Sequence, residues 1–343
     1  MKYNLSRGRR ASGFSLIELM VSVLIGLIVL AGVAQVVLNS KRAYLDNQDV
    51  SYVQDNARFV MDILSRDIRL AGYKGCATEG AAVTSAIKQD VLPNVLGVAG
   101  AAGFLPLTGY ESAGINEFTG IAANTDSLMI RRGDILNDVA LLTGDPSSNK
   151  FTFANSAATS NFKARLPMMI VDAKCQHVGI FTATAASATS VNHANSGDNC
   201  TSDLKSGKNC AADFTAGSKY FAAGSRVMPY VAAGYFIGAS TVSPGMPALK
   251  RLAVRTNAAN NLEAYTEEIA QGVSDMQIKY GVVTGQGAAA TFVYNDAAAV
   301  ADWNNVVAVQ LSLTFRSVGT WKQNNGALMT KTMNSTIQIR NRI

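Results

Sequence analysis

The sequence predicts an α+β fold in which a long N-terminal helix packs on an antiparallel β-sheet head that carries a loop-rich insertion. Three observations predict it: an apolar run near the N-terminus, a helical repeat of apolar residues after that run, and strand-like alternation near the C-terminus. The chain has 343 residues, of which 48% are hydrophobic and 16% charged. This composition is sufficient for one or two packed domains and differs from that of an intrinsically disordered chain.

The apolar run extends from residue 14 to residue 38 and contains one charged side chain, that of Glu18. At 1.5 Å per residue, a helix of this length reaches about 37 Å, enough to cross a bilayer core of about 30 Å. Four cations precede the run: Lys2, Arg7, Arg9 and Arg10. They place the N-terminus in the cytoplasm, although Lys41 and Arg42 beyond the run reduce the asymmetry. We therefore expect a span at 14–38, with the residues beyond about 40 outside.

Gly13 stands directly before the apolar run. In an ordinary signal peptide the small residues follow a shorter apolar core, and that core is discarded on cleavage. Here a cut after Gly13 removes only the leader and keeps the apolar helix. We therefore expect a leader peptide at 1–13, cleaved between Gly13 and Phe14.

Glu18 is the residue that a plain membrane anchor does not explain. A carboxylate in a membrane span costs on the order of 2.5–3.5 kcal/mol, and such residues usually have a partner and a function. Cleavage after Gly13 frees the α-amino group of Phe14, four residues earlier on the same helical face. In staggered helices, Glu18 of one subunit can pair with the Phe14 ammonium of its neighbour, where exclusion of water strengthens the attraction. Glu18 is therefore the candidate assembly residue.

The second part of the predicted helix is amphipathic. Its apolar residues recur at helical spacing; they are Val50, Val53, Ala57, Val60, Leu64 and Ala71. No proline interrupts residues 14–72, and Gly72 is a suitable stop, so we expect one helix of about 57 residues and about 85 Å. We expect its apolar stripe to pack on the globular head.

The head is expected to have two parts. Residues 73–245 are rich in Ala, Gly, Ser, Thr and Asn and predict a loop-rich middle region with short strands at 127–131, 166–171 and 227–237. In residues 246–343, apolar residues alternate with polar ones and predict half-buried strands of an antiparallel sheet with one face on the long helix. The inward residues are Met276, Ile278, Tyr280, Val282, Val307, Val309, Leu311, Leu313, Phe315, Ile337 and Ile339.

The chain has four cysteines: Cys76, Cys175, Cys200 and Cys210. An even count after an export-type N-terminus favours disulfides, for which three connectivities are open. We favour Cys200–Cys210, which closes a short polar loop, and Cys76–Cys175, which ties the end of the long helix to the middle region.

No metal site, cofactor or catalytic residue is expected. CxxC and HExxH are absent, as are GxSxG, GxxxxGK[ST] and GxGxxG after a strand. Asp198 and Asp203 could ligate calcium, but segment 195–203 lacks EF-hand spacing, and a disulfide-closed surface loop is the stronger interpretation. The formal net charge of +6 falls to about +2 without the four leader cations, which gives little support to nucleic-acid binding. The chain is therefore not expected to be an enzyme.

Residues 13–21, Gly-Phe-Ser-Leu-Ile-Glu-Leu-Met-Val, resemble the class III signal of type IV prepilins. The resemblance implies that a prepilin peptidase cuts between Gly13 and Phe14 and that the new Phe14 amine is N-methylated. It also implies that Glu18 guides docking of the subunit into the growing filament.

Three further stretches are similar to the PilW family of minor pilins: residues 64–73 with Gly75 and Cys76, residues 268–273, and Trp303 with residues 306–312. They cover both ends of the chain and not its middle. The family implies a low-abundance subunit that primes assembly of the type IV pilus. Its partners would be other minor pilins, the major pilin, the inner-membrane assembly platform and a tip adhesin.

Two other functions are compatible with these features. A J-type minor pseudopilin of type II secretion shares the processing signal and a similar architecture. A module displayed at the filament tip, binding a surface or DNA through the middle region, is the alternative of another class.

Overall fold

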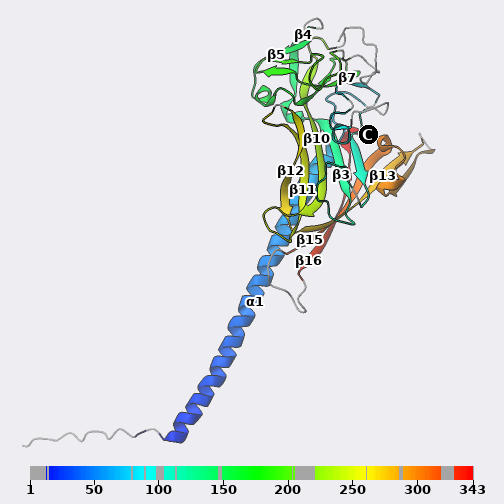
Figure 1. Ribbon diagram of the computed structural model, residues 1–343. Helices are drawn as coiled ribbons and strands as arrows, with labels where there is room; N and C mark the ends of the chain where they lie inside the picture. The colour runs from blue at the N-terminus through cyan, green and yellow to red at the C-terminus, as the bar shows by residue number, and fades with distance from the viewer. Residues whose placement is uncertain are drawn as a thin grey trace, which may run out of the picture. The chain divides into compact units, whose positions relative to one another are not determined.

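The computed structural model describes most of the chain. The described residues are 13, 15–78, 80–88, 90–97, 104–112, 114–145, 149–202, 204, 221–259, 261–285, 289–317 and 328–342. The chain divides into two compact units, Met1–Tyr52 and Val53–Ile343. Helix α1, Leu16–Arg69, contributes residues to both of them (Figure 1).

Helix α1 has 54 residues, and its ends lie within three residues of the expected bounds. It ends because the chain turns at Gly72, whose φ of 76° lies in the left-handed region that favours glycine. The Gly72 N–H donates to the carbonyl oxygen of Arg131 at 2.9 Å. A Cβ at Gly72 would stand 3.0 Å from the Cβ of Pro106, so the position also lacks room for a side chain. The long helix and its stop at Gly72 are confirmed.

The part of α1 in the second unit buries one stripe of side chains. The buried residues are Val53, Ala57, Val60, Met61, Leu64, Asp67 and Ile68. Hydrogen bonds join this part to β12, and the turn after it to the 3₁₀ turn that follows β16. The Asn56 amide donates to the carbonyl oxygen of Gln271 at 3.2 Å, and the Asn341 amide donates to those of Leu70 and Ala71 at 3.4 and 3.3 Å. The predicted packing of the amphipathic half on the head is therefore present.

Among the described residues, twelve strands form the larger sheet. They are β1 (Ala82–Ser85), β2 (Leu107–Tyr110), β3 (Ser127–Gly133), β4 (Val139–Asp145), β5 (Lys150–Phe153), β6 (Pro167–Val171), β7 (His177–Thr182), β8 (Ala185–Ser187), β9 (Ser190–Asn192), β10 (Arg226–Ala239), β11 (Pro247–Thr256) and β12 (Leu262–Gln271). The long strand β10 pairs with β4 and β6 at its start and with β3 and β11 further along (Figure 1). The pairing of β1 with β7 is parallel and the others are antiparallel, so this sheet is mixed.

Four strands from the described ranges form the smaller sheet, in the order β14–β13–β15–β16. Their bounds are β13 (Val273–Thr284), β14 (Thr291–Asn295), β15 (Val306–Arg316) and β16 (Thr330–Gln338). The predicted inward residues of β13 are buried, as are the last four of β15. Val307 is the exception. The register of the β13–β15 pairing shifts between Gly281 and Val282, so Val282 pairs with Val306 and not with Val307. Val306 is buried, whereas Val307 is only partly buried.

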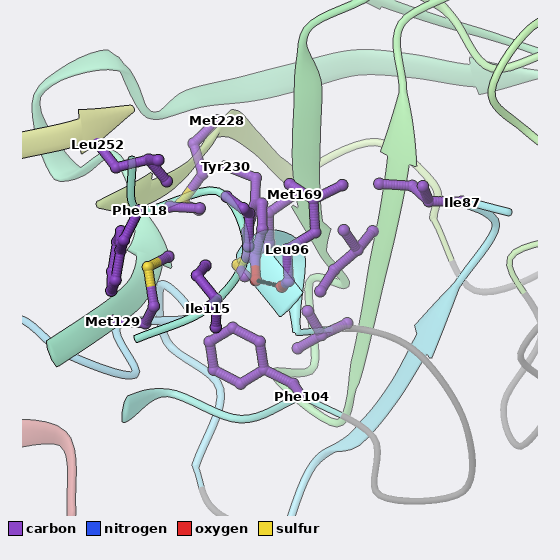
Figure 2. Close-up of a cluster of buried hydrophobic side chains, with 14 of the residues drawn as sticks. Ile87, Leu96, Phe104, Ile115, Phe118, Met129, Met169, Met228, Tyr230 and Leu252 are labelled. Atoms are coloured by element: carbon purple, nitrogen blue, oxygen red, sulfur yellow. Dashed lines mark hydrogen bonds between the residues drawn. The ribbon is translucent and has the colours of Figure 1, made fainter. Parts of the chain in front are cut away.

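The remaining helices in the described part of the chain are short. They are α2 (Pro93–Leu96) and the 3₁₀ turns η1 (Ile135–Asn137), η2 (Ala158–Asn161), η4 (Ala297–Ala299), η5 (Trp303–Asn305) and η7 (Arg340–Arg342). Figure 2 shows Leu96 of α2 in a buried apolar cluster with Phe104, Met169 and Tyr230, where the Tyr230 hydroxyl donates to the carbonyl oxygen of Leu96.

The middle region contains more strand than the sequence predicts. The expected strands at 127–131, 166–171 and 227–237 correspond to β3, β6 and β10, but β1, β2, β4, β5, β7, β8 and β9 lie in stretches that we expected to be loops. All of them are three to seven residues long, and several pair with strands far away in sequence, as β1 does with β7. The expected boundary between residues 245 and 246 lies in the turn between β10 and β11, which pair in one sheet.

Candidate functional site

The first part of α1 is apolar on all its sides. Every large apolar side chain from Leu16 to Leu38 is at least 50% exposed. The most apolar 18-residue window has a mean hydropathy of 2.7, and none of it is buried. By length and composition this helix can cross a membrane. A helix that is hydrophobic all round requires an apolar environment, which a bilayer or a bundle of neighbouring helices supplies.

Ser15 and Glu18 form a reciprocal cap at the start of α1. The Glu18 N–H donates to the Ser15 hydroxyl oxygen at 3.2 Å, and the Ser15 N–H donates to Oε2 of Glu18 at 3.3 Å. Two N–H groups that the first helical turn leaves without intrahelical partners are thereby satisfied. A carboxylate in this turn also interacts favourably with the helix dipole. In the isolated chain, Glu18 therefore has a local function before it meets any partner.

The other residues of the predicted processing site lie directly before this cap. Gly13 is exposed, whereas Phe14 and leader residues 1–12 lie outside the described residues. Ser15 was not among the predicted site residues. The signal that could have revealed it is the Ser-x-x-Glu pattern at 15–18, which is typical of a helix start.

A buried polar contact anchors the last turns of α1 in the head. Asp67 is 8% exposed and accepts from Nη2 of Arg132 on β3 at 3.2 Å. It also accepts from the hydroxyl group of Tyr235 on β10. Burial raises the pKa of Tyr235 and the nearby Asp67 charge raises it further, so the phenol stays protonated as the donor. This contact selects the orientation in which the helix docks on the sheet.

The cysteines lie in the second unit. Cys76 is bonded to Cys175 with a Cα–Cα distance of 5.4 Å, so the expected Cys76–Cys175 pair is present in the structure. Cys200 is also disulfide-bonded. Cys210 lies outside the described residues, and its pairing with Cys200 stays a prediction.

In segment 195–203, which was considered for calcium binding, Asp198 forms an ion pair with Arg165. Asp198 lies 3.2 Å from Nη1 of Arg165, and Asp203 lies outside the described residues. Within the described part of the chain, no group of three or more His, Cys, Asp or Glu side chains is placed to hold a metal ion.

Arg131 is buried, although a charged side chain is expected at the surface. It is 1% exposed, and its guanidinium donates to the carbonyl oxygens of Val95 and Leu105 and to the hydroxyl oxygen of Thr108. These bonds tie the segment around α2 to β3. A pocket of about 240 Å³ opens near this segment. Its lining residues are Gly72, Lys74, Val83, Phe104, Pro106, Asn304, Asn305 and Asn341.

Two family models match the chain. Residues 8–34 match the model described as "Prokaryotic N-terminal methylation motif". With the long apolar helix and the β-sheet head, this match makes the chain a type IV pilin-like protein with a class III signal. Residues 234–341 match the model described as "Type IV Pilus-assembly protein W". Over this part the chain is similar to the PilW family of type IV pilus-assembly proteins, which is a structural family and not one of enzymes.

The comparison with curated proteins gives no match, and neither does the comparison with solved structures. The two family matches connect the chain with the pilus assembly machinery, and the methylation motif implies processing as a prepilin.

Proposed function

We propose that this protein is a minor pilin that primes assembly of the type IV pilus. Prepilin peptidase cuts it between Gly13 and Phe14, and the new Phe14 amine is N-methylated. Before assembly the subunit is inserted once in the inner membrane with its N-terminus in the cytoplasm. It then moves into the periplasmic and extracellular filament, in a tip complex with other minor pilins and an adhesin.

The start of α1 is the observation that carries this proposal. It combines a fully exposed apolar helix with a single carboxylate, Glu18, in its first turn. In the free chain this carboxylate accepts a hydrogen bond from the Ser15 N–H. Glu18 and Phe14 are four residues apart, so in staggered helices Glu18 of one subunit can meet the Phe14 ammonium of its neighbour. A charge pair formed away from water is strong.

A deletion strain of the source bacterium tests the proposal. We expect loss of surface pili and of twitching motility, both restored by the wild-type gene, and normal secretion of exoproteins. Sheared pili should contain the processed protein in low abundance relative to the major pilin. A deletion that abolishes exoprotein secretion and leaves pili and twitching normal would instead assign the chain to type II secretion as a pseudopilin.

A further inference from the structure

Strand β14 is an exposed apolar edge of the smaller sheet. Its ladder partner among the described residues is β13, so its other edge carries backbone groups that no strand covers. Phe292, Val293 and Tyr294 are 48%, 55% and 36% exposed. Alternate side chains of a strand point to opposite faces, so this strand is apolar on both faces as well as open at its edge.

Two other edge strands of the described sheets, β12 and β16, carry charged side chains. On β12, Glu263 and Glu267 form ion pairs with Arg255 and Arg251 at 2.8 and 3.3 Å. Strand β16 contains three threonines and carries Lys331. Charges on an edge strand oppose pairing with other chains. Strand β14, with the sequence Thr-Phe-Val-Tyr-Asn, has none.

The edge is held ready for pairing. The Phe292 ring lies over Gly281, where a Cβ would stand 2.7 Å from the ring, and it meets the Tyr294 ring edge-on with centroids 5.0 Å apart. The Thr284 and Thr291 hydroxyls lie 2.7 Å apart at one end of the ladder. At the other end, Lys279 and Asp296 form an ion pair at 3.0 Å. A strand fixed in this way loses little conformational freedom when another strand joins it.

We propose that β14 pairs antiparallel with β14 of a second copy of this chain, centred on Val293. The strand is symmetric in residue type about that position. Val293 would face Val293 of the other copy, each Phe292 would face a Tyr294, and each Thr291 would face an Asn295. Opposed aromatic residues are favourable cross-strand pairs, and the absence of charge removes repulsion between identical strands. The two sheets would join into one of eight strands.

The contact is small. Five residues on each side bury much less than the total of about 1,200 Å² typical of stable complexes. Two copies held in one membrane or one filament are at high effective concentration, which compensates for a weak contact. The strength of the contact therefore rests on the proposed membrane anchoring, whereas the register of the two strands depends on the sequence of β14 alone.

Cysteine cross-linking in membranes of the source bacterium tests the register. Two copies with different epitope tags are produced at normal levels, and covalent dimers are scored on non-reducing gels. Directly opposed residues of antiparallel strands have Cα atoms about 4.5–5.5 Å apart, which suits a disulfide. Val293→Cys should therefore cross-link to itself. Thr291→Cys and Asn295→Cys should cross-link only when produced together, because residues 291 of the two copies would lie about 14 Å apart.

Asn334→Cys, exposed on the opposite edge strand β16, is the matched control and should give no dimer. When Val293→Lys is added to both copies, the yield of the covalent dimer between Thr291→Cys and Asn295→Cys should fall about fivefold. The substitution places two lysines opposite each other at the centre of the ladder, where they repel. Absence of dimers with Val293→Cys would overturn the proposal. So would a dimer from Thr291→Cys alone, or an adduct whose mass shows a different chain on the edge. Processing after Gly13 and surface pili are scored in the same cells, so failure of this inference is distinguishable from failure of the proposed function.

Discussion

The disulfide between Cys76 and Cys175 should stabilise the head strongly. It joins residues 99 positions apart. In the chain-entropy model, a closed loop of about 100 residues is worth about 4.7 kcal/mol at 25 °C. The Cys76→Ala, Cys175→Ala double variant should lose a free energy of unfolding of this order.

The native fold should survive the double substitution, because the turn that holds Cys175 has other support. The Asp172 side chain accepts from the Gln176 and His177 N–H groups at 2.7 Å each, and the Cys175 N–H donates to the Asp172 carbonyl oxygen at 2.9 Å. The loss therefore acts mainly through the unfolded state, which regains the freedom that the bond removes.

Urea unfolding of the full-length protein in detergent, followed by tryptophan fluorescence, measures the effect. With a slope of about 3 kcal/mol/M, the midpoint should fall by about 1.5 M. Each single variant should cost about as much as the double variant, because either substitution removes the whole bond. A midpoint shift below about 0.3 M, or single-variant losses that simply add, would refute this reasoning.

Three further predictions concern single residues. Glu18→Ala should leave insertion and processing intact but abolish priming, because a neighbouring Phe14 ammonium without its carboxylate costs about 3–5 kcal/mol. The control Ser15→Ala removes only a cap worth about 1 kcal/mol and should keep surface pili. Normal piliation of the Glu18 variant would contradict the role of Glu18 in assembly. Asp67→Ala should destabilise the head by about 3–5 kcal/mol in urea unfolding, because it leaves the largely buried Arg132 without its carboxylate. A loss below about 1 kcal/mol would show that the pair does not anchor α1. Burial lowers the pKa of His193 to about 4, so its imidazole binds a proton more readily in the unfolded chain than in the folded one. The free energy of unfolding should therefore fall by about 3 kcal/mol as the pH drops from 6.5 to about 4. His193→Phe should remove this part of the pH dependence, and an identical dependence of stability on pH in wild type and variant would exclude the effect.

The elements with local signals were the predictable ones. Helix α1 is marked by its apolar residues and by Gly72, and β15 contains all the alternating residues from Val307 to Phe315. Val307 was assigned to the wrong face because a bulge changes the pairing without changing the residue pattern.

The parts that depend on distant contacts were not predictable. Strand β1 is four residues long and forms a ladder with β7, almost a hundred positions later, so its own sequence carries little signal. Arg131 is buried because carbonyl groups from another segment surround its guanidinium, which no pattern around position 131 indicates. The class of protein was accessible nevertheless, because the residues around Gly13 and Glu18 are contiguous in the chain.

The mature N-terminus is the measurement that tests the account most directly. Protein extracted from membranes of the source bacterium, with its prepilin peptidase active, is analysed by intact mass and by N-terminal sequencing. The account predicts a chain that begins at N-methylated Phe14 and retains the whole of α1. A mature chain that still carries residues 1–13, or one cleaved after the apolar run, would contradict it.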